Sequence, residues 1–221
     1  MSNQAASRPS TLYILSAPSG GGKSSLARAL ADRAENIVTS VSHTTRPQRP
    51  GEADGVDYFF VDLAQFEQMV KDEGFLEHAQ VFGHCYGTSR HAVEQAIKAN
   101  QSVLLDIDWQ GAQQVRAAFK EAVSVYILPP SVEVLAQRLV DRGRETPEQI
   151  SARLDEAASE MSHYREYDYI LVNTEFDQAL GELEALIHRG EPPRSGRGFD
   201  VAALVDCAKS VRLKTSETAN L

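Results

Sequence analysis

Mostly apolar segments alternate with amphipathic ones along this chain, in a rhythm that predicts strand–helix repeats. Each short aliphatic run is followed by a stretch whose apolar residues have helical spacing. The predicted strand and helix pairs are 11–15 with 23–34, 102–108 with 109–119, 122–128 with 131–141, and 168–173 with 174–189. Strands that are apolar throughout are typical of a parallel sheet covered on both faces. The pattern therefore predicts an α/β fold with a parallel central sheet flanked by helices.

The stretch from about His43 to Ala99 departs from this rhythm. Turn-forming residues at 44–60 precede a predicted helix at 62–74 and strand and loop material at 75–89. The predicted organisation is a flexible N-terminus at 1–10, a core at 11–42 and 93–189 with a polar lid at about 140–155, an insertion at 43–92, and a linker with a C-terminal amphipathic helix at 190–221. The apolar face of that last helix is expected to carry Val201, Leu204, Val205 and Ala208.

Composition limits the kind of partner. The 221 residues carry a formal net charge of -9, which argues against broad electrostatic binding to nucleic acid or to an anionic membrane. Cys85 and Cys207 lie far apart and form no CxxC pair, so neither a disulfide framework nor a thiolate zinc site is expected. We expect a cytoplasmic protein with a small-molecule ligand, and the sequence leaves open whether it forms a homo-oligomer.

The segment from Ala17 to Ser24 has the strand, glycine-rich turn and Lys-Ser order of a phosphate-binding loop. Its glycines let backbone N–H groups surround an anion, Lys23 can reach the β and γ phosphates, and Ser24 can ligate Mg²⁺. Ala17 stands where the strict pattern has glycine, and alanine is acceptable there if its φ is negative. The alternative is a glycine-rich turn that caps a helix without binding a ligand.

A second set of groups suits another phosphate. Arg46 and Arg49 lie three residues apart in a proline-punctuated loop, Tyr58 follows shortly after, and Tyr86 lies further on. Two guanidinium groups and two phenols could clamp a phosphate, because arginine presents paired donors that match phosphate oxygens. Either arginine alone would read as an exposed surface charge.

Six segments resemble those of guanylate kinases in their order and spacing, and the resemblance to bacterial guanylate kinases is close. They read SAPSGGGKSS, SVSHTTRPQRPGEADGVDY, FLEHAQVFGHCYGTS, VLLDIDWQG, LPPSVEVLAQRLVDRG and ILVN. The resemblance runs from about Thr11 to Arg189 and is far more specific than the phosphate loop alone. It implies a P-loop nucleoside-monophosphate-kinase fold with an inserted GMP-binding subdomain and a lid, and Ala17 is compatible with this family.

The resemblance implies a GMP site in and beside the insertion. Its members would be Ser42, Arg46, Arg49, Tyr58, Glu77, Tyr86, Gly87, Thr88 and Asp108. The two arginines and two tyrosines would hold the phosphate, whereas Glu77 and Asp108, with Ser42 and Thr88, would face guanine. Carboxylate acceptors suit the N1–H and N2–H₂ donors of guanine and repel the N1 lone pair of adenine. By spacing alone, the two carboxylates could also be surface charges or helix caps.

The resemblance also implies an ATP site. Its loop residues would be Ala17, Pro18, Ser19, Gly20, Gly21, Gly22, Lys23, Ser24 and Ser25. Arg138, Arg142 and Arg153 would reach the ATP phosphates together with Lys23, although each could be an exposed helix charge, and the neighbouring Arg144 is given no role. Asn173 would contact adenine or cap the following helix. Asp106, at the end of a predicted strand, is expected to steer Mg²⁺ through water.

The expected reaction is ATP and GMP giving ADP and GDP, with Mg²⁺ as cofactor, ATP as co-substrate and dGMP as a further acceptor. No general base is expected, because the accepting phosphate oxygen is already ionised near neutral pH. One alternative is a catalytically inactive guanylate-kinase-like interaction module, against which the intact loop argues. Another is a kinase for AMP, UMP or dTMP, against which Glu77 and Asp108 argue.

Overall fold

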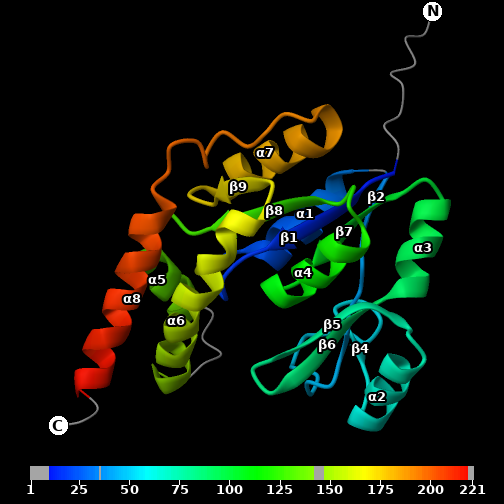
Figure 1. The fold of residues 1–221 in the computed structure, drawn as a ribbon, viewed down its shortest axis with the longest axis horizontal. Helices are drawn as coiled ribbons and strands as arrows, with labels where there is room; N and C mark the ends of the chain where they lie inside the picture. Colours follow the sequence, from blue (N-terminus) through cyan, green and yellow to red (C-terminus); the bar gives the residue numbers. More distant parts are fainter. Residues whose placement is uncertain (1–9, 35, 142–146, 219–221) are drawn as a thin grey trace, which may run out of the picture. The chain divides into compact units, whose positions relative to one another are not determined.

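The computed structural model describes residues 10–34, 36–141 and 147–218 (Figure 1). Within these residues, one sheet has the strand order β2-β7-β1-β8-β9 and a second has the order β4-β3-β6-β5. The first sheet pairs β2 with β7 and β8 with β9 in parallel. Its strands are β1 (Leu12–Ser16), β2 (Ile37–Thr39), β7 (Ser102–Asp106), β8 (Val123–Leu128) and β9 (Tyr169–Val172). The predicted α/β fold with a parallel sheet is confirmed.

The described residues fall into two compact units. One comprises the described residues up to Ile14 and those of Ala31–Val123, and the other comprises Leu15–Leu30 and the described residues from Ser124 onward. The division falls within β1 and within α1 (Lys23–Arg33). The expected insertion at 43–92 lies inside the first unit, and the domain boundaries given above stay predictions. The expected flexible N-terminus falls almost entirely on residues 1–9, which lie outside the described residues.

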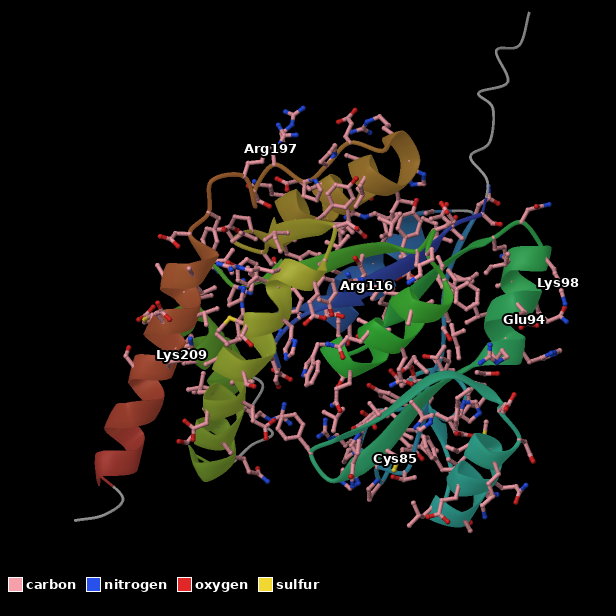
Figure 2. The ribbon with its side chains drawn as sticks, viewed as in Figure 1. Cys85, Glu94, Lys98, Arg116, Arg197 and Lys209 are labelled. Atoms are coloured by element: carbon pink, nitrogen blue, oxygen red, sulfur yellow. The ribbon has the colours of Figure 1, made fainter. Side chains whose placement is uncertain are left out.

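The first unit contains the smaller sheet and the helices next to it in sequence. Besides β2 and β7, it contains β3 (His43–Thr44), β4 (Phe59–Phe60), α2 (Leu63–Lys71), β5 (Phe75–Val81), β6 (His84–Ser89), α3 (Arg90–Lys98) and α4 (Trp109–Ala118). Asp62 caps α2 by accepting from the Gln65 backbone N–H at 2.8 Å. Buried Phe66 then packs its ring 4.6 Å from that of Phe75 on β5. Figure 2 shows Cys85 on the small sheet and Glu94 and Lys98 on α3.

The β5–β6 hairpin determines which side chains share a face of the small sheet. Phe82 and Gly83 connect the strands with φ of 49° and 79°, the positive values that a tight two-residue hairpin turn requires. The register pairs Glu77 with Thr88 and Ala79 with Tyr86. Because alternate residues of a strand share a face, Glu77 and Thr88 lie on the same face as Ala79 and Tyr86.

The second unit is built around helices that pack on β8 and β9. Its further elements are α5 (Val132–Asp141), α6 (Pro147–Ser162), the 3-10 turn η1 (His163–Glu166), α7 (Phe176–Arg189) and α8 (Val201–Thr218). Helices α6 and α8 lie side by side (Figure 1), and Lys209 projects from α8 (Figure 2). One buried cluster joins apolar residues of β8, α5 and α6 to the expected face of α8, namely Val201, Leu204, Val205 and Ala208. The predicted apolar face of the C-terminal helix is confirmed.

Two polar segments have more structure than their composition indicates. Helix α6 begins at Pro147, inside the expected lid, whereas residues 142–146 lie outside the described residues. In the expected linker, the backbone N–H of Ser195 donates to the Glu182 carboxylate at 3.0 Å and its Oγ accepts from the Val172 N–H at 3.0 Å. These contacts fix the segment that leads to α8. None of the helices in the described part of the chain is long and apolar enough to cross a membrane.

Candidate functional site

The glycine-rich loop joins β1 to α1 and belongs to the second unit. Gly20 and Gly22 have φ of 92° and 94°, conformations that favour glycine. The Gly21 N–H donates to the Pro18 carbonyl at 2.8 Å and closes the turn before Lys23 begins α1. Ala17 is not among the described residues with positive φ, so the condition for alanine at this position is met.

Two predicted residues lie directly against this loop. The Asn173 Nδ2 donates to the Gly21 carbonyl at 3.1 Å, and the Arg138 Nη2 donates to the Asn173 carbonyl at 2.8 Å. Within the described residues, the Asn173 Oδ1 and the Arg138 Nη1 are buried without a hydrogen-bond partner. A buried donor and a buried acceptor left unpaired are costly unless a ligand engages them. We call the loop 17–25 with Arg138, Arg153 and Asn173 the donor site.

Helix α6 reaches the loop through one serine. The Arg153 Nη1 donates to the Ser19 Oγ at 2.7 Å, and the Ser19 N–H donates to the Glu160 Oε2 at 2.9 Å. The buried Tyr126 hydroxyl donates to the Glu160 carbonyl at 2.7 Å and fixes that part of α6. Arg153 therefore lies at the loop as predicted, Arg142 lies outside the described residues, and Glu160 was not anticipated from the sequence.

In the first unit, Arg46, Tyr58 and Tyr86 come together. Arg46 is only 7 % exposed, and its guanidinium carbon lies 5.2 Å from the Tyr58 ring centroid. The Tyr58 and Tyr86 rings are 6.0 Å apart. Burial, with a further contribution from the charge of Asp106, raises the pKa of the Tyr58 phenol to about 12. Tyr58 therefore remains a hydrogen-bond donor at neutral pH.

Glu52 organises the arginine loop. Its carboxylate accepts from the Arg46 Nη2 at 2.7 and 3.0 Å and from the Arg49 backbone N–H at 2.8 Å. Burial lowers the pKa of Arg46, but hydrogen bonds and charges from Glu52 and Tyr86 outweigh it and raise the pKa. The Arg49 side chain is exposed. Glu52 was not singled out from the sequence, although it lies only three residues after Arg49.

The carboxylates predicted to face guanine have different surroundings. Glu77 is 4 % exposed and Thr88 fully buried, and the Thr88 Oγ1 donates to the Glu77 Oε1 at 2.6 Å. The surface-charge alternative is therefore wrong for Glu77. Asp108 is the N-cap of α4, with its Oδ1 accepting from the Gly111 N–H at 2.9 Å, so the capping alternative holds for Asp108. Capping leaves carboxylate lone pairs for further donors.

Ser42 and Gly87 complete the predicted acceptor residues. The Ser42 carbonyl accepts from the Phe59 N–H at 2.9 Å, next to the start of β3. Gly87, on β6, is paired in the sheet with His43 on β3 and with His78 on β5. We call the following set the acceptor site: Ser42, Arg46, Arg49, Tyr58, Glu77, Tyr86, Gly87, Thr88 and Asp108. All of them belong to the first unit.

The oxygen donors expected to serve Mg²⁺ are a hydroxyl and a carboxylate. Ser24 is exposed in the first turn of α1, and Asp106 is half-buried at the end of β7. No group of three or more His, Cys, Asp or Glu side chains suited to a metal occurs in the described part of the chain. Each of the two is, taken by itself, an oxygen ligand of the kind that Mg²⁺ takes, and Mg²⁺ commonly has few protein ligands together with substrate phosphates.

The chain is similar to known proteins over most of its length. The sequence model of the guanylate kinase family matches residues 9–190. The chain is 57% identical over 178 residues to the guanylate kinase of Alkalilimnicola ehrlichii, covering 80% of this chain and 88% of that protein. The chain belongs to the guanylate kinase family. It is also 56% identical over 178 residues to the guanylate kinase of Chromohalobacter salexigens, covering 80% of this chain and 83% of that protein.

The fold of this chain is also similar to that of a solved guanylate kinase structure. The crystal structure of guanylate kinase from Anaplasma phagocytophilum superposes with a TM-score of 0.70 at 35% identity, covering 90% of this chain and 95% of that one. The resemblance drawn from the six sequence segments is thus confirmed. Helix α8 begins after the last residue that the family model matches.

Proposed function

We propose that this chain transfers the γ-phosphate of ATP to GMP and gives ADP and GDP, a step of purine nucleotide metabolism. The observation that carries the proposal is the Glu77 carboxylate, buried beside the Thr88 hydroxyl in the same unit as the Arg46 cluster. A buried acceptor of this kind favours a ligand edge that presents donors, because a wrong base would leave it unpaired. Family membership supports the same reaction.

In the proposed acceptor site, each group has a definite task. Arg46, held by Glu52, and Tyr58 donate to the GMP phosphate together with Arg49 and Tyr86. Glu77 and Asp108 accept from guanine N1–H and N2–H₂, and Ser42, Gly87 and Thr88 line the base. The same contacts suit dGMP, which carries the same base and phosphate.

In the proposed donor site, the loop N–H groups and Lys23 bind the ATP phosphates. Arg138 and Arg153 add positive charge where the transferred phosphoryl group develops negative charge. The unpaired Arg138 Nη1 and Asn173 Oδ1 supply further contacts to the nucleotide, with Asn173 directed to adenine. Arg142 is proposed for the same phosphate cluster on the resemblance alone.

Mg²⁺ would be held by Ser24, with Asp106 acting through water, and it would neutralise charge on the β and γ phosphates. The residues of the chain position the two nucleotides and stabilise the negative charge of the transferred phosphoryl group. No residue needs to remove a proton, because the attacking oxygen belongs to an ionised phosphate. Chelation of divalent metal with excess EDTA is expected to stop ADP release, and added Mg²⁺ to restore it.

A substrate panel tests the proposed function. Purified protein with Mg²⁺ and ATP should release ADP when GMP is added and more slowly with dGMP, whereas AMP, UMP and dTMP should give little. Lys23→Ala should lose activity by about a hundredfold or more, and Lys98→Ala, at an exposed position of α3, should not. Equal turnover of AMP would refute the guanine assignment, and GMP binding without ADP release would favour the inactive module.

We also infer that the enzyme acts in the cytoplasm. Cys85 and Cys207 are both free thiols in the described structure, which suits a reducing compartment.

A further inference from the structure

Gly111 is bonded to one carboxylate of the proposed guanine pocket, that of Asp108, and lies beside the other, that of Glu77. It lies in the first turn of α4, the helix that also carries the labelled Arg116 (Figure 2). Its backbone N–H donates to the Asp108 Oδ1 at 2.9 Å. A Cβ built on Gly111 would lie 3.0 Å from the Glu77 Cδ and closer still to its Oε2. The α-carbon of Gly111 therefore forms part of the surface against which the Glu77 carboxylate rests.

Backbone conformation does not explain a glycine at this position. Gly111 is not among the described glycines with positive φ, and it lies within a helix. Alanine is the better helix former at such a position. What alanine would remove is the space that the Glu77 carboxylate occupies. Glycine is thus required here by its neighbour and not by its own backbone.

We propose that Gly111 is a positioning residue for guanine recognition, an inference that rests on the proposed function. Its missing side chain lets the Glu77 carboxylate lie against α4, while its N–H orients Asp108. The Thr88 hydroxyl holds the other oxygen of Glu77 at 2.6 Å. Gly111 therefore fixes the direction from which the two carboxylates accept the N1–H and N2–H₂ donors of guanine.

Gly111→Ala should move the carboxylate and keep the fold. The atom nearest to the new methyl group is the far end of the flexible Glu77 side chain, which can shift at little cost, and the Ile107 Cβ is at an ordinary 3.4 Å. Gly181→Ala is a matched control, because Gly181 lies within helix α7, is exposed, and has no atom within 4 Å of a built Cβ. Gly181→Ala should melt at or above the temperature of the parent chain, because alanine is the better helix former, and Gly111→Ala should melt close to the parental temperature.

The experiment measures ADP release with GMP and with IMP, whose base lacks the 2-amino group, at varied ATP. For Gly111→Ala, we expect kcat/KM for GMP to fall about tenfold, because charged hydrogen bonds are misaligned, with the KM for ATP within about twofold of the parent. The preference for GMP over IMP should shrink, because GMP loses the contact that IMP never made. Gly181→Ala should keep the parental kcat/KM for GMP, the parental KM for ATP and the parental preference for GMP over IMP.

A Gly111→Ala protein with the parental preference for GMP over IMP would overturn the inference. So would an equal loss with GMP, IMP and ATP accompanied by a lower melting temperature, because that pattern reports general destabilisation. If the parent chain fails to turn over GMP, the proposed function fails separately. Calorimetric titration with GMP then still decides the inference, since equal affinity of parent and Gly111→Ala contradicts it.

Discussion

At the level of single residues, the acceptor site depends on a buried charge that another residue compensates. Arg46 has its guanidinium over Tyr58 and its Nη2 on the Glu52 carboxylate. Burial raises the pKa of Glu52, but hydrogen bonds from Arg46 and from the Arg49 N–H outweigh it and lower the pKa below the ordinary 4.5. Glu52 thus stabilises the folded state in its ionised form.

Glu52→Gln should therefore destabilise the protein in a pH-dependent way. Near pH 7 we expect a loss of about 1–3 kcal/mol in the free energy of unfolding, because Arg46 stays buried without its counter-charge. A lowered folded pKa contributes stability that is present above the unfolded pKa and lost as pH falls through the folded pKa. The gap between parent and variant in urea unfolding should therefore narrow from about pH 7 to about pH 3.

Glu67→Gln, on the exposed surface of α2, is the control and should change stability by no more than about 0.5 kcal/mol. A gap for Glu52→Gln that stays constant across this pH range would show that the Glu52 charge is not what stabilises the loop.

The role of a single residue could be predicted where its own chemistry indicates it, and could not be predicted where it depends on a contact with a residue distant in the sequence. Arginine and tyrosine chemistry alone pointed to Arg46, Tyr58 and Tyr86, and the structure brings these three together. Glu160 contacts Ser19 across 141 residues of sequence, and no local pattern reports such a contact. The role of Gly111 likewise follows from the position of Glu77, which only the packing of β5 on α4 defines.

At the level of elements, α6 is connected to the phosphate loop at Arg153 and Glu160. The Glu160 carboxylate accepts the Ser19 N–H while Arg153 donates to the Ser19 Oγ. Glu160→Ala should release one backbone group of the loop, so we expect KM for ATP to rise about threefold to tenfold, with KM for GMP unchanged. Glu156→Ala, exposed on the same helix, is the control. Equal KM values for ATP in all three proteins would show that the contact does not shape the donor site.

Element prediction succeeded where apolar periodicity was strong. The four long strand–helix pairs appear in the structure, because their runs are long enough to bury a face. The three-residue strand β2 and the helix α3 were not predicted separately, since neither has a long apolar pattern. The sequence at 75–89 predicts strand and loop but no defined β5–β6 hairpin, because Phe82 occupies a left-handed position where Asn or Asp is the usual signal.

At the level of the whole molecule, the residues of the two proposed nucleotide sites belong to different compact units. The acceptor site lies in residues of the first unit and the donor site in residues of the second. A ligand that binds only the folded state stabilises it by about 2.7 kcal/mol at a concentration one hundred times its Kd. Hydrogen exchange can show which segments the ligand stabilises, because the protection of each backbone amide depends on the free energy of its local opening.

We therefore expect hydrogen-exchange protection to divide between the units when each nucleotide is added alone. GMP should slow exchange in β5, β6 and the first turn of α4, and ATP with Mg²⁺ should slow exchange in the loop 17–25 and in α6. Mass spectrometry of peptic peptides would measure both patterns, with Lys23→Ala as the protein in which the ATP pattern weakens and the GMP pattern persists. Protection of the loop 17–25 by GMP alone, with β5 and β6 unaffected, would mean that the acceptor site has been assigned to the wrong residues.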